Sequence, residues 1–277
     1  MQSGIQREFE CLPWSGSPPR PPVAFISLAP AVVPVESLRV MTYNIQGHAV
    51  LRRERHIDDV AAVVRQLRPD VLGLQEVHRG THSGRSGDQL QQLASATGME
   101  LFFGQSIERM GGEYGNAVLT RGSIESGRTW PLGGKGEPRS LLECRIAVGG
   151  LRFTLLVAHL AAWFRFHRAS RAAQIEQLAE ILSTIAPPFI LVGDFNTPPR
   201  APEIQRLLRS ENLAIAGEHL EKSHRLSRTR LDYVFTDLSW KTEASWVVRI
   251  GPSDHWPLLA DLTREASGEV DPGTDPG

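Results

Sequence analysis

The chain has 277 residues, a formal net charge of −1 and two cysteines. A near-neutral charge gives no reason to expect the general affinity for nucleic-acid backbones that basic domains show. The two cysteines, Cys11 and Cys144, are too few for a disulfide framework, and no apolar stretch reaches the roughly 20 residues of a membrane span.

The two ends differ in composition from the middle. Residues 1–36 are rich in Pro, Ser and Gly and are expected to form a disordered leader. Residues 265–277 are expected to form a disordered tail. Without a linker or internal repeat between them, residues 37–264 are expected to form one catalytic domain. We expect a cytoplasmic monomer; the segment Ala29-Pro30-Ala31 resembles a signal-peptide cleavage site and keeps secretion as the alternative.

Strands and helices alternate along the middle of the chain. Apolar runs predict strands over residues 37–43, 71–75, 101–104 and 116–121. Apolar residues at helical spacing predict a helix over 57–67, and Asp88 and Gly98 are the expected cap and stop of a second helix.

Gly149-Gly150 separates two alternating apolar runs, residues 140–148 and 151–158, and predicts a β-hairpin. Further elements are expected as helices around 175–182 and 204–208 and as strands over 189–193, 231–235, 246–250 and 255–262. The hairpin means that the sheet is not purely parallel. The predicted fold is α/β (α+β), with two mixed sheets packed face to face and helices outside.

The run FILVGDFN, residues 189–196, ends a buried strand in a carboxylate and an amide. Successive side chains of a strand point to opposite faces, so Asp194 and Asn196 are expected to point the same way and Phe195 into the core. Two polar groups at the end of a core strand are costly unless a metal ion or polar substrate compensates their desolvation.

The same pattern recurs: an apolar strand ends in, or begins with, one or two polar residues. Each could be a turn residue, but ligands in α/β folds collect where strand ends meet. The residues concerned are Asn44, Glu76, His159, Asp194, Asn196, Asp232, Asp254 and His255. Such an oxygen-rich set suits Mg²⁺ or Mn²⁺, and the sequence has no glycine-rich phosphate loop and no GxSxG nucleophile motif.

Taken in order, these motifs resemble the endonuclease/exonuclease/phosphatase superfamily, the deoxyribonuclease-I-like metal-dependent phosphoesterases. The matching segments are TYNIQG (42–47), LQE (74–76), GNAVLTR (115–121), AHL (158–160), GDFN (193–196), LDYVF (231–235) and SDH (253–255). The resemblance covers roughly residues 38–263 and implies a four-layer sandwich.

The resemblance also implies roles for individual residues. Glu76 resembles the principal metal ligand, Asn44 a contact to the metal or the phosphate, and Asp254 an acid near the metal. For catalysis, Asp194 resembles the acid that aligns or deprotonates the water, and Asn196 the amide that steadies the phosphoryl oxygens.

The two histidines complete the implied catalytic set. His159 stands where the family places a phosphate-contacting residue, and His255 resembles the imidazole that stabilises the transition state. Neighbours in an extended segment point apart, so His255 cannot pair with Asp254. Asp232 is therefore predicted to hydrogen-bond His255, fix its tautomer and favour its charged form.

Three features are open to more than one interpretation. Many nucleases of the superfamily have an acid where this chain has Gln46, which weakens the case for a second metal. Arg139 could donate to a substrate phosphate or be a surface residue before a strand. His48, His56 and His78 are interpreted as surface residues.

Substrate class is left open by the sequence. The segment 161–168 interleaves Trp163, Phe164 and Phe166 with two arginines, which could stack on bases, rest on a membrane interface or pack on the next helix. The predicted function is Mg²⁺-dependent hydrolysis of a phosphoester, small or lipid-linked, by an activated water. A DNA or RNA nuclease is the alternative, and a catalytically inactive binding module the third possibility.

Overall fold

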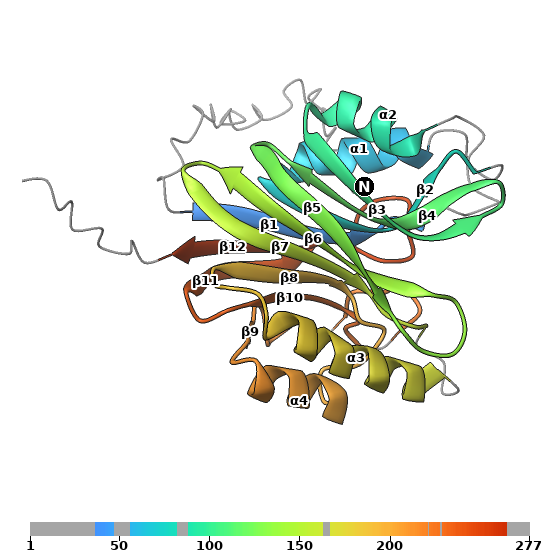
Figure 1. Ribbon diagram of the computed structural model, residues 1–277. Helices are drawn as coiled ribbons and strands as arrows, with labels where there is room; N and C mark the ends of the chain where they lie inside the picture. Colours follow the sequence, from blue (N-terminus) through green and yellow to red (C-terminus); the bar gives the residue numbers. More distant parts are fainter. Residues whose placement is uncertain are drawn as a thin grey trace, which may run out of the picture. The chain divides into compact units, whose positions relative to one another are not determined.

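Two six-stranded β-sheets form the centre of the structure, a computed structural model that describes residues 37–46, 56–81, 88–162, 167–220, 222–227 and 229–264 (Figure 1). The described residues belong to one compact unit, Val33–Gly277. The predicted leader and tail lie outside the described residues.

The first sheet has the order β11-β12-β1-β2-β4-β3. Its strands are β1 (Ser37–Asn44), β2 (Val71–Arg79), β3 (Glu100–Arg109), β4 (Gly112–Thr120), β11 (Trp240–Val247) and β12 (Leu258–Arg264). Only β1 and β2 run parallel, and the other neighbours are antiparallel. The sheet is therefore mixed, as predicted.

The second sheet has the order β5-β6-β7-β8-β10-β9. Its strands are β5 (Ser123–Leu132), β6 (Arg139–Val148), β7 (Leu151–His159), β8 (Phe189–Asp194), β9 (Ala214–Ile215) and β10 (Asp232–Thr236). Here β7 and β8 form the parallel pair, and Val148 pairs with Leu151 across the predicted Gly149-Gly150 turn.

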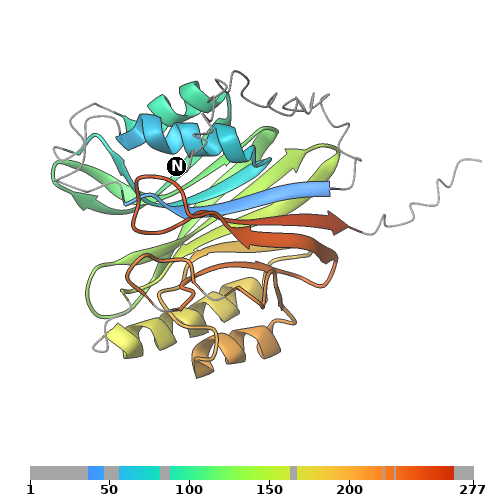
Figure 2. The same ribbon diagram turned by 180° about the vertical axis from the view of Figure 1, so that it is seen from behind.

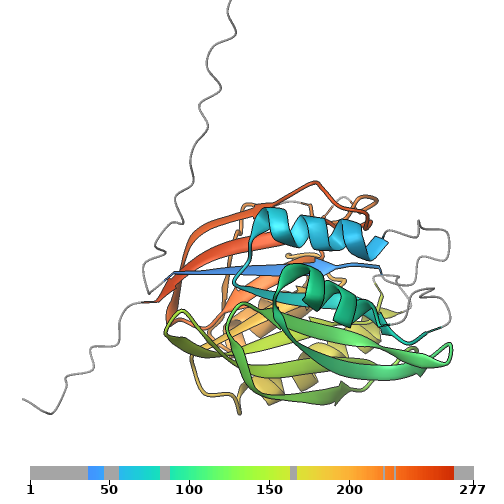
Figure 3. The same ribbon diagram turned by 90° about the horizontal axis from the view of Figure 1, so that it is seen from above.

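Helices cover the outer face of each sheet, which gives four layers (Figures 1 and 2). The helices are α1 (His56–Leu67), α2 (Gln89–Thr97), α3 (Arg168–Leu182) and α4 (Pro202–Ser210). Residues of α1 and α2 share a core with the first sheet, and residues of α3 and α4 share one with the second. A third core joins the two sheets face to face, and Figure 3 shows α1 and α2 lying over the first sheet. The predicted four-layer fold is confirmed.

Helix α2 shows how the sequence sets these boundaries. The Asp88 side chain accepts hydrogen bonds from the backbone N–H of Leu90 and Gln91, and Gly98 ends the helix at a left-handed φ of 67°. Both caps are the ones predicted, because they satisfy backbone groups that a helix end leaves unpaired. No helix in the described part of the chain is long and apolar enough to cross a membrane.

The strand boundaries depart from the prediction in several places. Strand β5 was not predicted, because Gly127 and Pro131 interrupt its apolar alternation. Strands β2 and β3 extend beyond the predicted ends, β11 begins earlier than predicted, and β12 begins at Leu258 rather than His255. His255 therefore lies in the loop before β12, which gives its side chain an orientation independent of the strand alternation.

Candidate active site

Strand register brings the polar strand ends of the second sheet together. His159 of β7 is the partner of Asp194 of β8, and Asp194 is in turn the partner of Asp232 of β10. All three side chains are at least 95 % buried. Three neighbouring strands thus present His159, Asp194 and Asp232 at the same level.

The first sheet contributes to the same site through Asn44. The Asn44 Nδ2 atom lies 3.1 Å from Oδ2 of Asp194 and 3.1 Å from Oε1 of Glu76. Asn44 is the last residue of β1, and Glu76 lies in β2, the parallel neighbour of β1. The site therefore lies where the two sheets meet.

Asp194 and Asn196 come together by a turn and not by strand alternation, which corrects the expected geometry. Strand β8 ends at Asp194, and Asn196 has a left-handed φ of 50°. The Asn196 N–H donates to Oδ1 of Asp194 at 2.9 Å, and its Nδ2 lies 3.3 Å from Oδ2. Phe195 is fully buried, as expected.

Gly193 makes the close approach of β7 and β8 possible. Its φ is 147°, and a Cβ added there would lie 1.9 Å from the Ala158 carbonyl oxygen. Only glycine fits this position, because both the backbone conformation and the space exclude a side chain. Gly193 thereby fixes the alignment of His159 with Asp194.

The predicted pairing of Asp232 with His255 is confirmed. His255 Nδ1 lies 2.9 Å from Oδ2 of Asp232, and its Nε2 lies 3.6 Å from Oδ2 of Asp194. The hydroxyl of Ser223 accepts the backbone N–H of Asp232, and the hydroxyl of Ser253 accepts that of His255, each holding one member of the pair.

These contacts separate the protonation behaviour of His255 and Asp194. Burial opposes charge on His255, but the carboxylates of Asp232 and Asp194 outweigh it and raise its pKa to about 10. Burial raises the pKa of Asp194 to about 6, against the lowering effect of His255. At neutral pH His255 is an imidazolium and Asp194 a carboxylate that retains appreciable basicity.

His159 is held differently, because its partner is Arg139. Arg139 Nη1 lies 3.0 Å from Nδ1 of His159, and His159 Nε2 lies 3.7 Å from Oδ2 of Asp194. Burial and the charge of Arg139 move the pKa of His159 well below its usual range. Arg139 is 9 % exposed, so its alternative interpretation as a surface residue is wrong.

The predicted metal ligands surround Asn44. Glu76 has a left-handed φ of 59° at an irregularity in the pairing of β2 with β4. A non-glycine residue in that conformation is strained, which is common at functional sites. The pKa of Asp254 is lowered. Burial and the charge of Glu76 raise this pKa, but the interactions of Asp254 with His224 and His255 outweigh them.

This donor set fits a divalent cation. Glu76, Asp194 and Asp254 bring three carboxylates to one site, where a hard cation would offset their mutual repulsion. Among the described residues, possible ligand atoms lie within 4.8 Å of one another in two groups, Asp194–Asp232–His255 and His224–Asp254–His255. Glu76 is in neither group, and the Asp232–His255 hydrogen bond engages part of both.

Gln46 contacts two of the predicted metal ligands. Its Nε2 donates to Oδ2 of Asp254 at 2.8 Å, and its backbone N–H donates to Oδ1 of Asn44 at 3.0 Å. The position where many nucleases have an acid is therefore occupied here by a neutral donor that orients a carboxylate.

Sequence reasoning missed His224. Its ring lies edge-on to that of His255 with 4.6 Å between centroids, and its Nε2 is 3.6 Å from Oδ2 of Asp254. Its Nδ1 accepts the backbone N–H of Ser227 at 2.9 Å. His224 does not end a predicted strand, and only a bridge between the 224 and 255 backbones brings it to the site, so the sequence carried no signal for it.

Several other predictions concern residues outside this site. His78 is 1 % exposed and contacts the Thr81 hydroxyl, so its interpretation as a surface residue is wrong, and His56 is half-buried. His48 and residues 163–166 lie outside the described residues. The role proposed for the aromatic residues of that segment stays a prediction.

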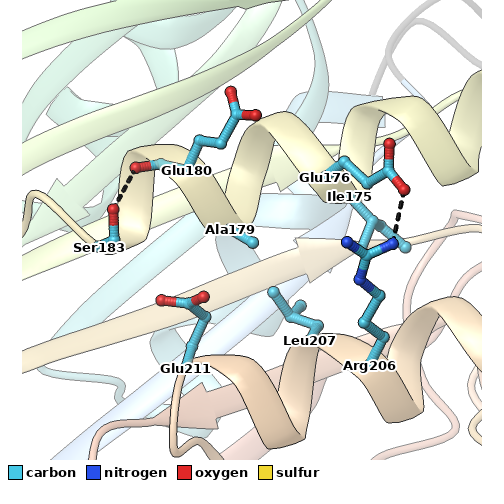
Figure 4. A pocket seen from close by; sticks show the side chains of 8 residues that line it. All are labelled: Ile175, Glu176, Ala179, Glu180, Ser183, Arg206, Leu207 and Glu211. Carbon is cyan, nitrogen blue, oxygen red and sulfur yellow. Dashed lines mark hydrogen bonds and ion pairs between the residues drawn. The ribbon is translucent and has the colours of Figure 1, made fainter.

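A groove of about 400 Å³ between α3 and α4 contains none of the predicted site residues (Figure 4). Charged side chains line it, and Arg206 pairs with Glu176 across it at 2.7 Å. The groove is separate from the cluster at the strand ends.

A second cavity, of about 490 Å³, borders the site through Arg139. Its lining combines hydroxyl and amide side chains of β3, β5 and β6, including Ser106, Thr129 and Ser140, with Gly133 and Gly134 of the loop between β5 and β6. It is the cavity of the two that lies beside a predicted site residue.

The fold and the strand-end cluster define a phosphoesterase-type four-layer sandwich. A model of the endonuclease/exonuclease/phosphatase family matches residues 41–255, and the chain belongs to this family. Family members are generally hydrolases that act on phosphoesters and use a divalent metal. A comparison with curated proteins gives no match.

Solved structures with the same fold include proteins of different activity. An endonuclease/exonuclease/phosphatase from Beutenbergia cavernae is 25 % identical over 83 % of this chain and 72 % of its own, with a TM-score of 0.64. Bacteroides thetaiotaomicron mannosyl-6-phosphatase is 18 % identical over 82 % and 99 %, with a TM-score of 0.66. D. rerio TDP2 complexed with single strand DNA product is 17 % identical over 82 % and 99 %, with a TM-score of 0.67.

Proposed function

We propose that this protein is a metal-dependent phosphoester hydrolase that uses an activated water, with Mg²⁺ or Mn²⁺ as its cofactor. One observation carries the proposal: Oδ2 of the buried Asp194 lies within 3.7 Å of four side chains, Asn44 and His159 at the ends of strands in the two sheets and Asn196 and His255 in the adjoining loops. A basic carboxylate among hydrogen-bond donors is what water activation beside a phosphate requires.

Each side chain then has a defined task. Asp194 takes a proton from the attacking water, whose oxygen forms a bond to phosphorus while the bond from phosphorus to the leaving oxygen breaks. The leaving oxygen takes a proton from Nε2 of His255 or from solvent. Asn196 and His159 donate hydrogen bonds to phosphoryl oxygens, and Asp232 keeps His255 charged and oriented.

Glu76, Asp254 and Asn44 are the residues that would hold the cation. When bound, it supplies charge neutralisation of the phosphate oxygens and lowers the pKa of a coordinated water. Of these residues, Glu76 and Asp254 provide the carboxylate oxygens that hard cations prefer, and Asn44 provides a carbonyl oxygen.

The substrate proposed is a small or lipid-linked phosphoester, because the net charge of −1 does not favour sequence-independent binding of DNA. The alternative, a nuclease, is supported by the similarity of the fold to a protein solved with single strand DNA product, and the phosphatase among the similar structures supports the first choice.

A turnover panel with Mg²⁺ or Mn²⁺ tests the proposal. It comprises a chromogenic phosphodiester and monoester, plasmid and single-stranded DNA, RNA, and phospholipid or sphingolipid vesicles. We expect turnover that a chelator abolishes and that Asp194→Ala lowers by at least about 10³-fold. Equal turnover by wild type and Asp194→Ala would show that the catalytic assignment is wrong, and a preference for nucleic acid would favour the nuclease.

A further inference from the structure

The cavity beside Arg139 lies at the same end of the sandwich as the candidate active site. Its volume of about 490 Å³ is within the range of small-molecule sites. It lies between β3 and β5, which are edge strands of the two sheets, and the start of β6 (Figure 1). Oγ of Ser106 in β3 lies 2.5 Å from Oγ of Ser140 in β6, so the two sheets are in contact here.

An irregularity in β3 lets two consecutive residues line the cavity. The pairing of β3 with β4 shifts between Gln105 and Ile107, so Ser106 is an extra residue in β3. Gly115 permits this bulge, because a Cβ added there would lie 2.0 Å from the Gly104 carbonyl oxygen. Side chains of a regular strand alternate between its faces, and bulges beside active sites often change the direction of a side chain.

The loop between β5 and β6 forms a third wall, and α3 holds this loop in place. The N–H of Gly133 donates to Oε1 of Gln177 at 2.8 Å, and the N–H of Lys135 donates to Oγ of Ser170 at 3.1 Å. The walls of the cavity are therefore built before any molecule binds, as is usual for small-molecule sites.

The side chains that line the cavity are polar, and Arg139 is the charged one among them. Hydroxyl and amide groups come from Gln105, Ser106, Thr129 and Ser140. One leucine and two prolines add small apolar surfaces. Hydroxyl and amide groups both donate and accept hydrogen bonds, so they suit a partner that does the same.

This lining disfavours several kinds of ligand. The described residues that form it include no aromatic side chain on which a base could stack and no carboxylate that would attract a cationic headgroup. Nη2 of Arg139 lies 3.3 Å from Glu137, which offsets the charge that a second phosphate would need. An acyl chain would bury the hydroxyl and amide groups without partners.

Arg139 connects the cavity with the candidate phosphate site. Its Nη1 lies 3.0 Å from Nδ1 of His159, and Nε2 of His159 lies 3.7 Å from Oδ2 of Asp194. Its Nε is buried and has no hydrogen-bond partner among the described residues. A buried N–H without an acceptor is costly, and an oxygen atom of a bound molecule would supply the acceptor.

We propose that this cavity binds a neutral polyhydroxylated group, a sugar or polyol, that the substrate carries on its phosphate. The inference rests on the proposed function and names the substrate class. Gln105 and Thr129 hydrogen-bond its hydroxyl groups from β3 and β5, Nε of Arg139 donates to one of its oxygens, and the apolar surfaces pack against its C–H groups. A soluble polyol phosphate and a lipid headgroup share this chemistry.

Kinetics with matched esters test the proposal. Inositol, hexose and glycerol phosphates, as monoesters and as methyl diesters, are compared with ethyl phosphate in the same two forms. Ethyl phosphate has the same phosphate and no hydroxyl group. We expect kcat/KM to be at least about 10²-fold higher for the best polyol ester, because a site built to bind hydroxyl groups rejects an analogue that lacks them.

Variants of the cavity walls separate this site from the catalytic centre. Thr129→Phe fills the cavity from an exposed position of β5, and we expect it to lower kcat/KM at least about tenfold for polyol esters and less than about twofold for ethyl esters. Thr129→Val and Gln105→Met each remove polar groups and should lower kcat/KM for polyol esters about three- to tenfold. Ser126→Phe, at an exposed position of the same strand outside the cavity, is the control and should change neither value.

Saturation-transfer NMR tests binding without turnover. The probe is the preferred polyol ester, or inositol phosphate if none is hydrolysed, added with Mg²⁺ to the full chain carrying Asp194→Asn. We expect transfer from the protein to the C–H protons of the polyol. Adding Thr129→Phe should abolish this transfer, and adding Ser126→Phe should leave it unchanged.

Vesicles distinguish the two sources of the polyol. They consist of phosphatidylcholine with and without phosphatidylinositol. Turnover of phosphatidylinositol without turnover of phosphatidylcholine supports a lipid headgroup, and turnover of the soluble esters alone supports a free polyol phosphate. Equal turnover of both lipids would contradict the preference for hydroxyl groups.

Two further results would overturn the proposal: equal kcat/KM for polyol and ethyl esters, or equal losses for the two kinds of ester in Thr129→Phe. Either result would leave the proposed function standing. If the wild type hydrolyses no ester, the proposed function fails and the NMR decides about the cavity. Transfer that Thr129→Phe abolishes would then support the polyol site, and transfer that is absent or unchanged in Thr129→Phe would overturn it.

Discussion

The Nδ1 atom of His255 lies 2.9 Å from Oδ2 of Asp232, a residue 23 positions earlier in the chain. The two belong to different segments, β10 and the loop before β12, which Ser223 and Ser253 hold through their hydroxyl groups. Because Asp232 is also the strand partner of Asp194, the carboxylate that favours the charged imidazole stands directly beside the proposed base.

Asp232→Asn should remove the charge on which the imidazolium of His255 depends. We expect kcat to fall by about 10²–10⁴-fold, because the amide neither stabilises the charged ring nor enforces its tautomer. Steady-state kinetics with the substrate found in the panel measures the effect. Asp237→Asn is the matched control. Asp237 is also buried and accepts the backbone N–H groups of Phe189 and Ser239, so its substitution should lower the melting temperature and leave kcat unchanged. Equal losses of kcat in both variants would contradict the role of Asp232.

Asp194→Asn should abolish turnover and stabilise the metal-free protein at high pH. The folded-state pKa of Asp194, about 6, lies above its usual value of 3.8, so the folded protein binds the proton more tightly than the unfolded chain does. The ionised carboxylate therefore costs stability above pH 6, and this cost fades as pH falls toward 3.8. Asn avoids it at every pH.

Urea denaturation in chelator at pH 8 and pH 5 measures this effect. We expect Asp194→Asn to gain about 1–3 kcal/mol over wild type at pH 8 and less at pH 5. A variant that loses more stability at pH 8 than at pH 5 would contradict the sign of the Asp194 shift. A variant that is more stable but inactive would show that Asp194 lowers the stability of the protein for the sake of its activity, as desolvated catalytic groups do.

Much of the site could be predicted because the ends of strands can be recognised in the sequence. A short apolar run ends where its polar residues begin, so His159 and Asp194 were predicted to belong to one site. That they are direct partners comes from the parallel pairing of β7 with β8, which the sequence did not show. The Asp232–His255 pair was predicted from the need of the imidazole for a carboxylate and from the family resemblance; the premise that His255 belongs to a strand was wrong, because β12 begins at Leu258.

Features that depend on loops and irregular backbone could not be predicted. His224 reaches His255 by a bridge between two loops, and Asn196 reaches Asp194 through a turn with a positive φ. Arg139 is the first residue of β6 and pairs with Leu132, the last residue of β5. Strand β5 has no clean apolar alternation, so this pairing could not be predicted. The residue types predicted a site for phosphoester chemistry, but the charge of each histidine depends on tertiary contacts.

Gly193→Ala should destabilise the protein far more than an ordinary glycine substitution. The new Cβ would lie 1.9 Å from the Ala158 carbonyl oxygen, in a backbone conformation with a φ of 147°. We expect a loss of more than about 2 kcal/mol in the free energy of unfolding, measured by urea denaturation, because β7 and β8 must separate. Gly98→Ala is the control: its φ is 67° but nothing lies within 4 Å of the added Cβ, so a loss of about 1 kcal/mol is expected. Equal losses would show that the approach of the two strands is not what selects glycine at position 193.

Gln46→Glu should convert a neutral donor beside Asp254 into a fourth carboxylate of the site. Gln46 Nε2 donates to Oδ2 of Asp254 at 2.8 Å, so the substitution replaces a hydrogen bond by a contact between two anions. In chelator the variant should be less stable than wild type, since like charges at this distance repel in a partly buried site. The same variant should bind Mn²⁺ about tenfold more tightly than wild type, because added negative charge favours a hard cation. Isothermal titration calorimetry measures this affinity. Gln92→Glu, which adds the same charge on the exposed face of α2, is the control and should change neither the stability in chelator nor the Mn²⁺ affinity.

Weaker Mn²⁺ binding by Gln46→Glu would contradict the assignment of Asp254 as a metal ligand. If the variant binds two Mn²⁺ ions and the wild type binds one, Gln46 is the residue that limits the site to a single metal.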